Sequence, residues 1–453
     1  MKKIGDRAIV IGSGMAGLLA ARVLADFFTN VTIVERDKLP ETPQTRRGVP
    51  QSIQPHILLA QGYRILENLF PNIGKELQAA GAIPIDWNRE LYHFHIDKGG
   101  WNTTLASPSP LVSVTCTRPL LEITLRQQVA KFANVGFQQQ CRVIGLLGND
   151  SRNRVKGVRL YRLDGNRAED LQGDLVVDAS GRGSQLPHWL QQLGYQPPPA
   201  TVVNPLLGYA TCRYRIPADK QPEGKVILIE HGPPNQKRLG YLACVEGEEW
   251  IATLGGYGRD YPPLDEAGFL EFAKSLPSPL FYEAIRQAQL TTPICAHRAT
   301  ANRLYRYEEV RLPAGLVAVG DAVCAPCPYY GQGITMGGMS SMVLQRWLQE
   351  QASKNGEPRF FPEKFYKQLA KQYAFPWSIA TQQDSQFTTT QGAIAFDWLS
   401  RRLNQYINWV ARQAHHDAQF HAYLMGVHQM VYSPVALFHP WVLFQAMRNR
   451  MKK

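Results

Sequence analysis

Three glycines near the N-terminus, spaced Gly12-x-Gly14-x-x-Gly17, follow directly on an apolar run from Ala8 to Ile11. The run predicts a buried parallel strand, and the glycines allow a tight turn and a close approach of the backbone to a pyrophosphate. A helix beginning at Met15 would point the positive end of its dipole at that anion. This order of strand, turn and helix favours a Rossmann-like α/β domain that binds a dinucleotide.

An acidic residue at the end of the next predicted strand narrows the choice of ligand. Glu35 follows an apolar run from Val31 to Val34 and lies eighteen positions after Gly17, near the ~20 expected for the carboxylate that accepts the ribose hydroxyls. Because a basic residue would suit a ribose phosphate, the carboxylate favours FAD or NAD. A single GxGxxG is weak evidence, and a glycine-rich structural turn is the alternative.

A second glycine-containing motif lies far along the chain. Asp321 follows an apolar run over 315–319, and Gly331-Gln-Gly333 precedes a helix expected from Ile334 to Glu350. The carboxylate can accept hydrogen bonds from a ribityl chain, and the exposed amides of the helix start would face an electron-rich ring. Since reduced flavin is anionic on its pyrimidine side, that dipole would stabilise it. The two motifs together suggest a flavin held from both sides; a purely structural strand, loop and helix is the alternative.

Further blocks of sequence resemble the PHBH-like, single-component FAD monooxygenases. The resemblance is closest to the branch of bacterial FAD-dependent hydroxylases and polyether olefin epoxidases, and it covers nearly the whole chain. The matching blocks are RRGVPQ at 46–51 with HILL at 56–59, TRPLLE at 117–122, LVVDASGRGS at 175–184, LGGYGRDYPP at 254–263, the Gly-Asp pair at 320–321 and PWSIATQQD at 376–384. Six ordered blocks are specific, although any one of them alone would not be.

The resemblance implies an FAD-binding set drawn from these blocks. Its members are Gly12, Ser13, Gly14, Met15, Ala16, Gly17, Glu35, Arg36, Arg47, Gln51, Arg118, Val143, Asp178, Asp321, Gly331, Gly333 and Ile334. Arg118 resembles the arginine that reaches the FAD phosphate and ribityl region, and Val143 the position that meets adenine through its backbone. Asp178 stands in a block associated with FAD and NAD(P)H, in which much of its role is structural. Arg47 and Gln51 lie in a loop that resembles the mobile segment near the isoalloxazine.

Departures from the branch pattern gather where substrate and flavin should meet. The branch carries two histidines and an arginine where this chain has a single His56 after the segment 53–55. Cys324 replaces a frequent histidine, and Pro-Cys-Pro at 326–328 replaces Phe-Asn-Pro. His56 is a candidate base for a phenolic substrate, whereas an olefin would need none. The substrate is therefore less defined than the cofactor.

The resemblance implies an FAD-dependent monooxygenase that uses NAD(P)H and O2. A flavin hydroperoxide shielded from water would hydroxylate or epoxidise a sizeable apolar or aromatic organic substrate. This chemistry needs no protein nucleophile, and the chain has no Gly-x-Ser-x-Gly elbow. The alternatives are a flavin reductase or dehydrogenase acting on an isoprenoid-type substrate, a flavin-dependent halogenase, whose W-x-W-x-I-P segment does not occur, and a non-enzymatic flavin carrier or sensor.

The length of 453 residues predicts two or three domains, because one core stops growing at ~250–300 residues. We expect a discontinuous FAD-binding domain over 1–85, 108–200 and 295–350. Segments 86–107 and 201–294 would form a mostly antiparallel substrate domain, and 351–453 a helical C-terminal cap. Seven scattered cysteines and an N-terminus without an apolar leader predict a cytoplasmic protein.

Two groups of potential metal or redox ligands stand out. Cys324 and Cys327 have CxxC spacing, but they begin no helix of a thioredoxin-like unit and no zinc set can be assembled around them. We expect them to fill a pocket wall. His416 and His421 are five positions apart, unlike the i, i+4 pair of a helical metal site, so no bound metal is predicted.

The charge of +12, from 49 basic and 37 acidic residues, suits an anionic ligand such as FAD or NAD(P)H. No basic run with interleaved aromatics occurs, which disfavours nucleic acid. Segment 427–453 is apolar, then basic, and too interrupted by prolines to reach the ~18 apolar residues that span a bilayer. We favour a helix packed over the substrate domain. The alternative is a peripheral membrane contact through Trp441 and Phe444, with Arg448, Arg450, Lys452 and Lys453 near lipid phosphates.

Overall fold

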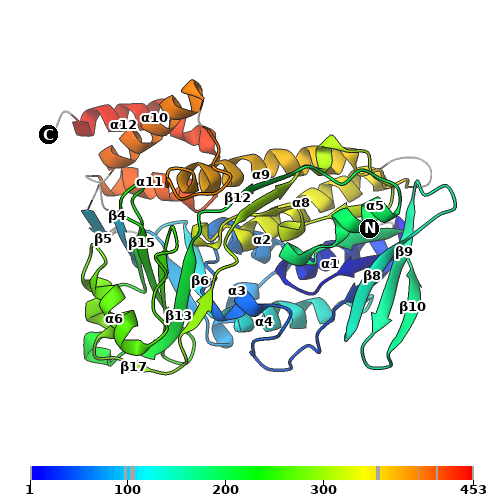
Figure 1. The fold of residues 1–453 in the computed structure, drawn as a ribbon, viewed down its shortest axis with the longest axis horizontal. Coiled ribbons are helices and arrows are strands. Elements are labelled where there is room, and N and C mark those ends of the chain that lie inside the picture. Colours follow the sequence, from blue (N-terminus) through cyan, green and yellow to red (C-terminus); the bar gives the residue numbers. More distant parts are fainter. Residues whose placement is uncertain are drawn as a thin grey trace.

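A five-stranded parallel sheet, in the order β20-β11-β1-β2-β7, organises the larger part of the molecule (Figure 1). Its strands are β1 (Gly5–Ile11), β2 (Phe28–Val34), β7 (Val135–Gln138), β11 (Leu175–Asp178) and β20 (Leu316–Ala318). The computed structural model describes residues 3–95, 99–102, 108–353, 358–395, 397–414 and 417–450. The apolar run 8–11 is buried, as expected for a parallel strand whose two faces are both covered.

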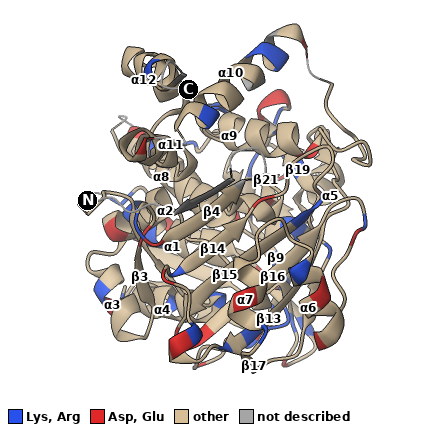
Figure 2. Ribbon diagram, turned by 90° about the vertical axis from the view of Figure 1, so that its left-hand side faces the viewer, with Lys and Arg blue, Asp and Glu red and all other residues tan. Residues whose placement is uncertain are grey.

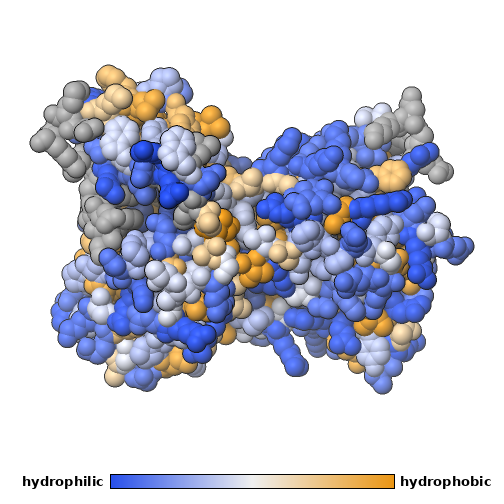
Figure 3. Space-filling model, turned by 45° about the horizontal axis from the view of Figure 1, so that its top comes forward, coloured by the Kyte–Doolittle hydropathy of each residue, from blue (hydrophilic) through white to orange (hydrophobic). Residues whose placement is uncertain are grey.

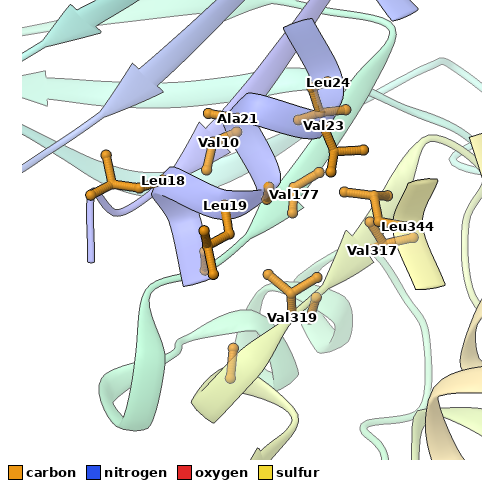
Figure 4. Packing of buried hydrophobic residues seen from close by; sticks show 14 of the residues in the cluster. Val10, Leu18, Leu19, Ala21, Val23, Leu24, Val177, Val317, Val319 and Leu344 are labelled. Carbon is orange, nitrogen blue, oxygen red and sulfur yellow. The ribbon is translucent and has the colours of Figure 1, made fainter. Parts of the chain in front are cut away.

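Helices from distant parts of the sequence pack on this sheet. They are α1 (Met15–Phe27), α2 (Ala60–Leu69), α3 (Ile73–Ala79), α4 (Arg118–Ala130), α5 (Leu186–Gln192) and α8 (Gly333–Ala352). In Figure 4, Leu19 of α1 lies near Val10 of β1, and Val317 of β20 lies beside Leu344 of α8, with Val177 of β11 between the two pairs. One hydrophobic core therefore joins the first strand to β20 near the end of the sheet.

Smaller sheets flank the parallel sheet. Strands β8 (Cys141–Gly148), β9 (Val155–Arg162) and β10 (Arg167–Gln172) form an antiparallel meander, and β3 (Ile83–Asp86) pairs with β6 (Val112–Thr115). A third sheet has the order β12 (Ala200–Val203), β19 (Asn302–Tyr305), β21 (Cys324–Ala325). This third sheet pairs the segment just after Asp321 with β19, which in turn pairs with β12.

An eight-stranded sheet forms the second layer, seen at the lower left of Figure 1. Along its path lie β17 (Gln289–Leu290), β13 (Gly208–Arg215), β16 (Glu249–Gly256), β15 (Arg238–Val245), β14 (Val226–Ile229), β4 (Leu91–His95) and β5 (Gly99–Asn102), with β18 (Cys295–His297) paired to β13. Only β14 and β4 run parallel. Phe269 and Phe272 of α6 (Glu266–Lys274) and Phe281 of α7 (Leu280–Ile285) bury one face of the sheet.

Helices dominate the C-terminal part of the chain. The first, α9 (Glu363–Asp384), packs its Phe365, Tyr366 and Tyr373 into the core of the parallel sheet. The helices α10 (Trp398–Ala414), α11 (Ala418–His428) and α12 (Pro440–Arg450) form a separate cluster with the short 3-10 helix η7 (Pro434–Phe438). Residues His416, Lys452 and Lys453 lie outside the described residues.

The predicted fold class is confirmed: a Rossmann-like parallel sheet, a mostly antiparallel second sheet and a helical C-terminal region occur together. Boundaries agree closely, since α8 begins one residue before the expected Ile334 and ends two residues after the expected Glu350. Within the described part of the chain, every helix is too short or too polar to cross a membrane.

Candidate cofactor site

The three glycines of the first motif occupy a turn between β1 and α1, and each meets different surroundings. Gly12 has φ +96°, and a Cβ there would lie 2.9 Å from the carbonyl oxygen of Ala179. A Cβ at Gly17 would lie 1.9 Å from the carbonyl oxygen of Gly12. At Gly14, by contrast, the nearest atom is a guanidinium nitrogen of Arg118 at 4.0 Å. Two glycines are thus required by packing, and the third leaves room beside the start of a helix.

That room is suited to a pyrophosphate. Gly14 caps α1 without any side-chain hydrogen bond, so the first amides of the helix keep their donors for a ligand. Arg118, the first residue of α4, is buried and faces the turn from the opposite side. It donates to Glu122 at 3.1 Å, which holds the guanidinium in place. An anion at this position would meet amide donors on one side and a guanidinium on the other.

Glu35 lies at the end of β2 and is the acceptor expected for a ribose. It accepts from the amide of Ser13 at 3.0 Å and from the Ser13 hydroxyl at 2.6 Å. Arg46 lies 3.1 Å away as an ion-pair partner. Burial alone would raise the pKa of Glu35, but Arg46 and the donors Ser13 and Asp37 outweigh it and hold the pKa below its usual range. The carboxylate is therefore ionised and ready to accept.

Arg46 is the buried arginine of the loop, and sequence reasoning missed it. Its guanidinium contacts three carboxylates: Glu35, Asp37 at 2.9 Å and Glu122 at 2.8 Å. Arg47, the residue that the resemblance singled out, is exposed on the outside of the same loop. Two adjacent arginines give no indication in the sequence of which one points inward. The acidic residues at 35, 37 and 122 were the available signal.

The second motif meets the first where α1 and α8 cross. Gly320 has φ +60°, and a Cβ there would lie 2.7 Å from the Cβ of Ala16; at Gly337 the same distance would be 3.5 Å. Only small residues allow the helices to approach this closely. Beyond the crossing, the Asp321 carboxylate faces the start of α8, since a Cβ at Gly333 would lie 3.9 Å from its Oδ1. The two motifs therefore form one site.

The start of α8 carries side-chain atoms that lack a hydrogen-bond partner in the protein. Gln332 caps the helix and Thr335 lies in its first turn; both are buried, and the Gln332 Oε1 and Thr335 Oγ1 atoms have no partner. Buried polar atoms of this kind require a ligand or water. Gly331 adopts φ +65°, the left-handed conformation that turns the loop into the helix. Ile334 is buried beside them. The Thr335 Oγ1 atom faces Gly62 of α2, since a Cβ there would lie 2.6 Å from it, so the Gln332 side chain remains as the candidate partner for the polar edge of the expected flavin.

The remaining predicted residues lie at varying distances from this centre. Val143 lies on β8, whose Cys141 amide donates to the Glu35 carbonyl at 2.9 Å, so it flanks the ribose end. The Asp178 carboxylate accepts hydrogen bonds from Ser180 and Ser184 of its own loop, and burial raises its pKa. These contacts give Asp178 a structural role.

Three predicted residues of the loop region contact the protein mainly through the backbone. Arg36 is exposed and donates to the Gly48 carbonyl at 3.2 Å. The Gln51 carbonyl lies 3.0 Å from the Nε2 atom of His56. Burial and the Arg118 guanidinium lower the pKa of His56 to about 3, so its ring is neutral at physiological pH. Because a carbonyl oxygen only accepts, Nε2 carries the proton and Nδ1 is the unprotonated nitrogen, so the role of His56 as a base stays a prediction.

Asp384, the last residue of α9, joins three separate segments through one buried carboxylate. Its Oδ1 accepts from the hydroxyls of Tyr330 at 2.7 Å and Tyr257 at 3.1 Å, and its Oδ2 accepts from the Asn302 amide at 2.6 Å. Tyr330 directly precedes Gly331, and Tyr257 follows the last residue of β16. Burial raises the pKa of Asp384 to about 6, despite these three donors. The carboxylate thus fixes the loop before α8 against the second sheet.

An aromatic wall surrounds this carboxylate, between the loop before α8 and the second sheet. It comprises Leu207, Tyr209, Leu239, Tyr257, Cys327, Tyr329, Tyr330 and Phe387. His231 lies inside it, with ring centroids 4.6 Å from Tyr257 and 4.7 Å from Tyr329. Neither ring nitrogen of His231 has a hydrogen-bond partner, and burial lowers its pKa. The wall is a packed apolar cluster that encloses polar atoms without a partner in the protein: the hydroxyls of Tyr209 and Tyr329 and the ring nitrogens of His231.

The cysteines of the CxxC pair are both buried and both reduced. Burial raises the pKa of Cys324 and of Cys327, and a neutral thiol is a poor nucleophile. Cys327 belongs to the aromatic wall, whereas Cys324 lies in the core of the parallel sheet. Among the described residues, no group of histidine, cysteine and acidic side chains could hold a metal ion.

Comparisons with known proteins give the family and the fold. No protein-family model matches the chain. Protein Rv3254 of Mycobacterium tuberculosis is 35% identical over 353 residues, which are 77% of this chain and 74% of the relative.

Solved structures with the same fold include a flavoprotein/dehydrogenase from Cytophaga hutchinsonii, with a TM-score of 0.66, 14% identity and coverage of 98% of this chain and 99% of that one. A triple mutant of the flavin-dependent brominase Bmp2 has a TM-score of 0.63 and 14% identity, over 99% of this chain and 100% of that one. The probable FAD-dependent monooxygenase PqsL from Pseudomonas aeruginosa has a TM-score of 0.58 and 15% identity, over 92% of this chain and 98% of that one. At these identities the likeness establishes the fold alone.

Proposed function

The chain belongs to the family of Protein Rv3254, and we propose that it is an FAD-dependent monooxygenase that uses NAD(P)H and O2 on an apolar or aromatic organic substrate. One observation carries the proposal. The open position at Gly14, opposite Arg118, and the Asp321 carboxylate at the start of α8 lie on the two sides of the Ala16 crossing. A ligand with a pyrophosphate at one end and a polar ring at the other fits both sides at once.

The chain's own residues would bind the two ends of FAD by different means. The amides at the start of α1 and the Arg118 guanidinium would hold the pyrophosphate, and Glu35 would accept the ribose hydroxyls. Asp321 would accept from the ribityl chain. Bound FAD would take a hydride from NAD(P)H and activate O2. The amides at the start of α8 would stabilise negative charge on the reduced ring, because they lie at the positive end of the helix dipole.

The aromatic wall would exclude water from the reacting atoms and bind the substrate. Its tyrosine and phenylalanine rings suit an apolar or aromatic molecule, and a dry site limits wasteful release of peroxide. The loss of Asp384 would loosen Tyr330 and with it the loop that faces the ring. No protein base is required for an olefin. For a phenol, two histidines are candidate bases: His56, whose Nδ1 is unprotonated when Nε2 donates to the Gln51 carbonyl, and His231, whose ring nitrogens have no partner in the protein.

The first experiment is a test of the cofactor. The purified protein should be yellow and should release FAD on acid precipitation, as expected for a cofactor bound without a covalent link. A folded, colourless protein that takes up no FAD on incubation would contradict the proposal.

The second experiment is a test of the reaction. Candidate substrates come from metabolite profiling of a strain that lacks the protein. With the correct compound, one atom of labelled O2 should enter the product while one NAD(P)H is consumed, and without it NAD(P)H oxidation should be slow and end in H2O2. Conversion of the substrate without O2 would favour a reductase or dehydrogenase instead.

A halogenase is the second candidate, because the brominase Bmp2 shares the fold over the whole chain. The sequence opposes it, since the W-x-W-x-I-P segment does not occur. Incubation with bromide or chloride separates the two reactions: a monooxygenase adds oxygen with or without halide, whereas a halogenase yields a halogenated product only in its presence.

A further inference from the structure

The most exposed large apolar side chains of the described residues lie in the C-terminal helices. Val435 is 73% exposed, Trp398 67%, Phe444 62% and Met447 57%. Phe438 of η7 and Leu403 of α10 are also exposed. Isolated apolar residues on a surface are ordinary, but a concentration of the largest ones in one small region indicates an interaction site. We call these six residues the C-terminal apolar surface.

These side chains are not needed for the packing of the helices that carry them. The inner face of α12 is already apolar: Val442 and Ala446 are fully buried, and Trp441 packs edge-on against Phe420 and beside Tyr423. Phe444 and Met447 lie three residues apart, on another face of the same helix. Apolar residues on both faces of a helix at the edge of a molecule imply a second apolar neighbour outside the fold.

The exposed side chains belong to neighbouring elements. Val435 and Phe438 are three residues apart in a 3-10 helix, so they share a face. The ring of Phe438 stacks on Tyr406 of α10 with a centroid distance of 5.1 Å, and α10 packs against α12. Figure 3 shows hydrophobic side chains gathered over these helices at the upper left.

The charge around this surface is positive. Between residues 397 and 450 the sequence has five arginines and two acidic residues: Asp397, which accepts from the Ser400 amide at the start of α10, and Asp417, which is paired with Arg448 at 2.6 Å. Arg401, Arg402 and Arg412 of α10 are exposed, and Figure 2 shows the basic residues on that helix. Exposed Trp and Phe beside arginines suit the headgroup region of a membrane, where rings enter the acyl boundary and guanidinium groups meet phosphates.

We propose that the C-terminal apolar surface binds peripherally to the face of an anionic phospholipid bilayer. A second copy of the chain is a poorer occupant, because two such surfaces would bring like charges together. The proposal goes beyond the enzymatic function and does not depend on it. It has one chemical consequence for that function: an apolar substrate could reach the enzyme from the bilayer rather than from water.

The test is flotation of the full chain with lipid vesicles. The protein should float with vesicles of phosphatidylcholine mixed with phosphatidylglycerol, and much less with pure phosphatidylcholine. The double variant Phe444→Ser/Met447→Ser should bind at least about tenfold more weakly, as expected for the loss of two buried apolar side chains. The double variant Arg401→Gln/Arg402→Gln should lose the preference for anionic lipid.

Matched controls separate this effect from general changes of surface. Leu163 and Phe361 are 50% and 51% exposed outside the C-terminal helices, so Leu163→Ser/Phe361→Ser should bind vesicles like the wild type. Arg167→Gln/Lys274→Gln removes two exposed charges elsewhere and should also bind normally. Circular dichroism verifies that each variant is folded, and the arginine pair remains informative if the apolar pair misfolds.

Two results would overturn the proposal. The first is a failure of the wild-type protein to float with either kind of vesicle. Equal flotation of the wild type and of every variant with both kinds of vesicle would have the same meaning. The second is a dimer in solution that the Phe444→Ser/Met447→Ser variant converts to a monomer, without vesicle binding by either form. That outcome would assign the surface to a second copy of the chain.

Discussion

Gly14 differs from its two neighbouring glycines because the protein itself would tolerate a side chain there. Its φ is −70°, and nothing but the Arg118 guanidinium lies within reach of a Cβ. Gly14→Val should therefore fold but lose FAD, because the side chain enters the space of the pyrophosphate. The ratio of FAD to protein after acid release measures the effect.

The control for this prediction is Gly136→Val. Gly136 lies on β7, a Cβ there would meet nothing within 4 Å, and its φ is not positive. It should bind FAD normally. Normal FAD content in Gly14→Val would mean that the turn serves the fold only.

Arg46 forms ion pairs with three carboxylates in a buried position, so its removal should be costly. Arg46→Ala leaves Glu35, Asp37 and Glu122 facing one another with little solvent, and we expect a loss of about 3–5 kcal/mol of unfolding free energy. Arg47→Ala, in the exposed neighbour, should change stability by less than about 0.5 kcal/mol. Urea unfolding measures both. Equal losses in the two variants would contradict the assignment of the buried role to Arg46.

The contrast between these arginines marks how far single residues could be predicted. Glu35 and the glycines follow from spacing, because a strand, a turn and a helix leave few positions that can face a dinucleotide. The direction in which a loop residue points depends on partners far away in sequence. For Arg46, the hydrogen bond to Glu122 sets the inward direction of the side chain, and that bond exists only once α4 has packed beside the loop.

Among the elements, the C-terminal end of α9 acts on the loop before α8 through Asp384. The pKa of this carboxyl is raised to about 6 in the folded protein, whereas it is ~3.9 in an unfolded chain. A raised pKa means that the stabilisation is fully present below about pH 4 and is lost as the pH rises through about 6. The difference between the two values corresponds to about 3 kcal/mol.

Asp384→Asn tests this assignment, because the amide does not titrate and its oxygen can still accept from Tyr330 and Tyr257. Between about pH 4 and pH 7, the unfolding free energy of the wild type should fall by about 3 kcal/mol relative to the variant. Thermal or urea unfolding over this range provides the comparison. Parallel pH profiles for the two proteins would show that Asp384 has an ordinary pKa.

Most helices and strands near the site were predictable from the sequence, but the hydrogen bonds between them were not. The helix after Gly333 appears where the sequence predicted it, and the second sheet is mostly antiparallel, as expected. The block 376–384 was recognisable as a motif, but its role in holding Tyr330 was invisible. Hydrogen bonds between segments so distant in sequence depend on the packing of whole elements, and local periodicity contains no information about them.

At the scale of the whole molecule, bound FAD would connect the part of the main core around α1 with the part around α8. We expect removal of FAD to lower the unfolding free energy of that core by about 3–4 kcal/mol relative to protein in FAD at 100–1000 times its Kd. The cluster of α10, α11 and α12 has its own core around Val410 and Phe420 and should be little affected. Amide hydrogen exchange resolves the two regions. A uniform loss of protection over both would contradict this division.

The crossing of α1 and α8 at Ala16 also sets an order of events during synthesis. Asp321 and the first turn of α8 leave the ribosome only after about 300 residues have followed the glycine turn. The parallel sheet likewise lacks its edge strand β20 until that moment. A nascent chain can therefore close the parallel sheet only after β20 has been made, and a glycine turn that forms early waits for Asp321 and the start of α8 to complete the proposed cofactor site.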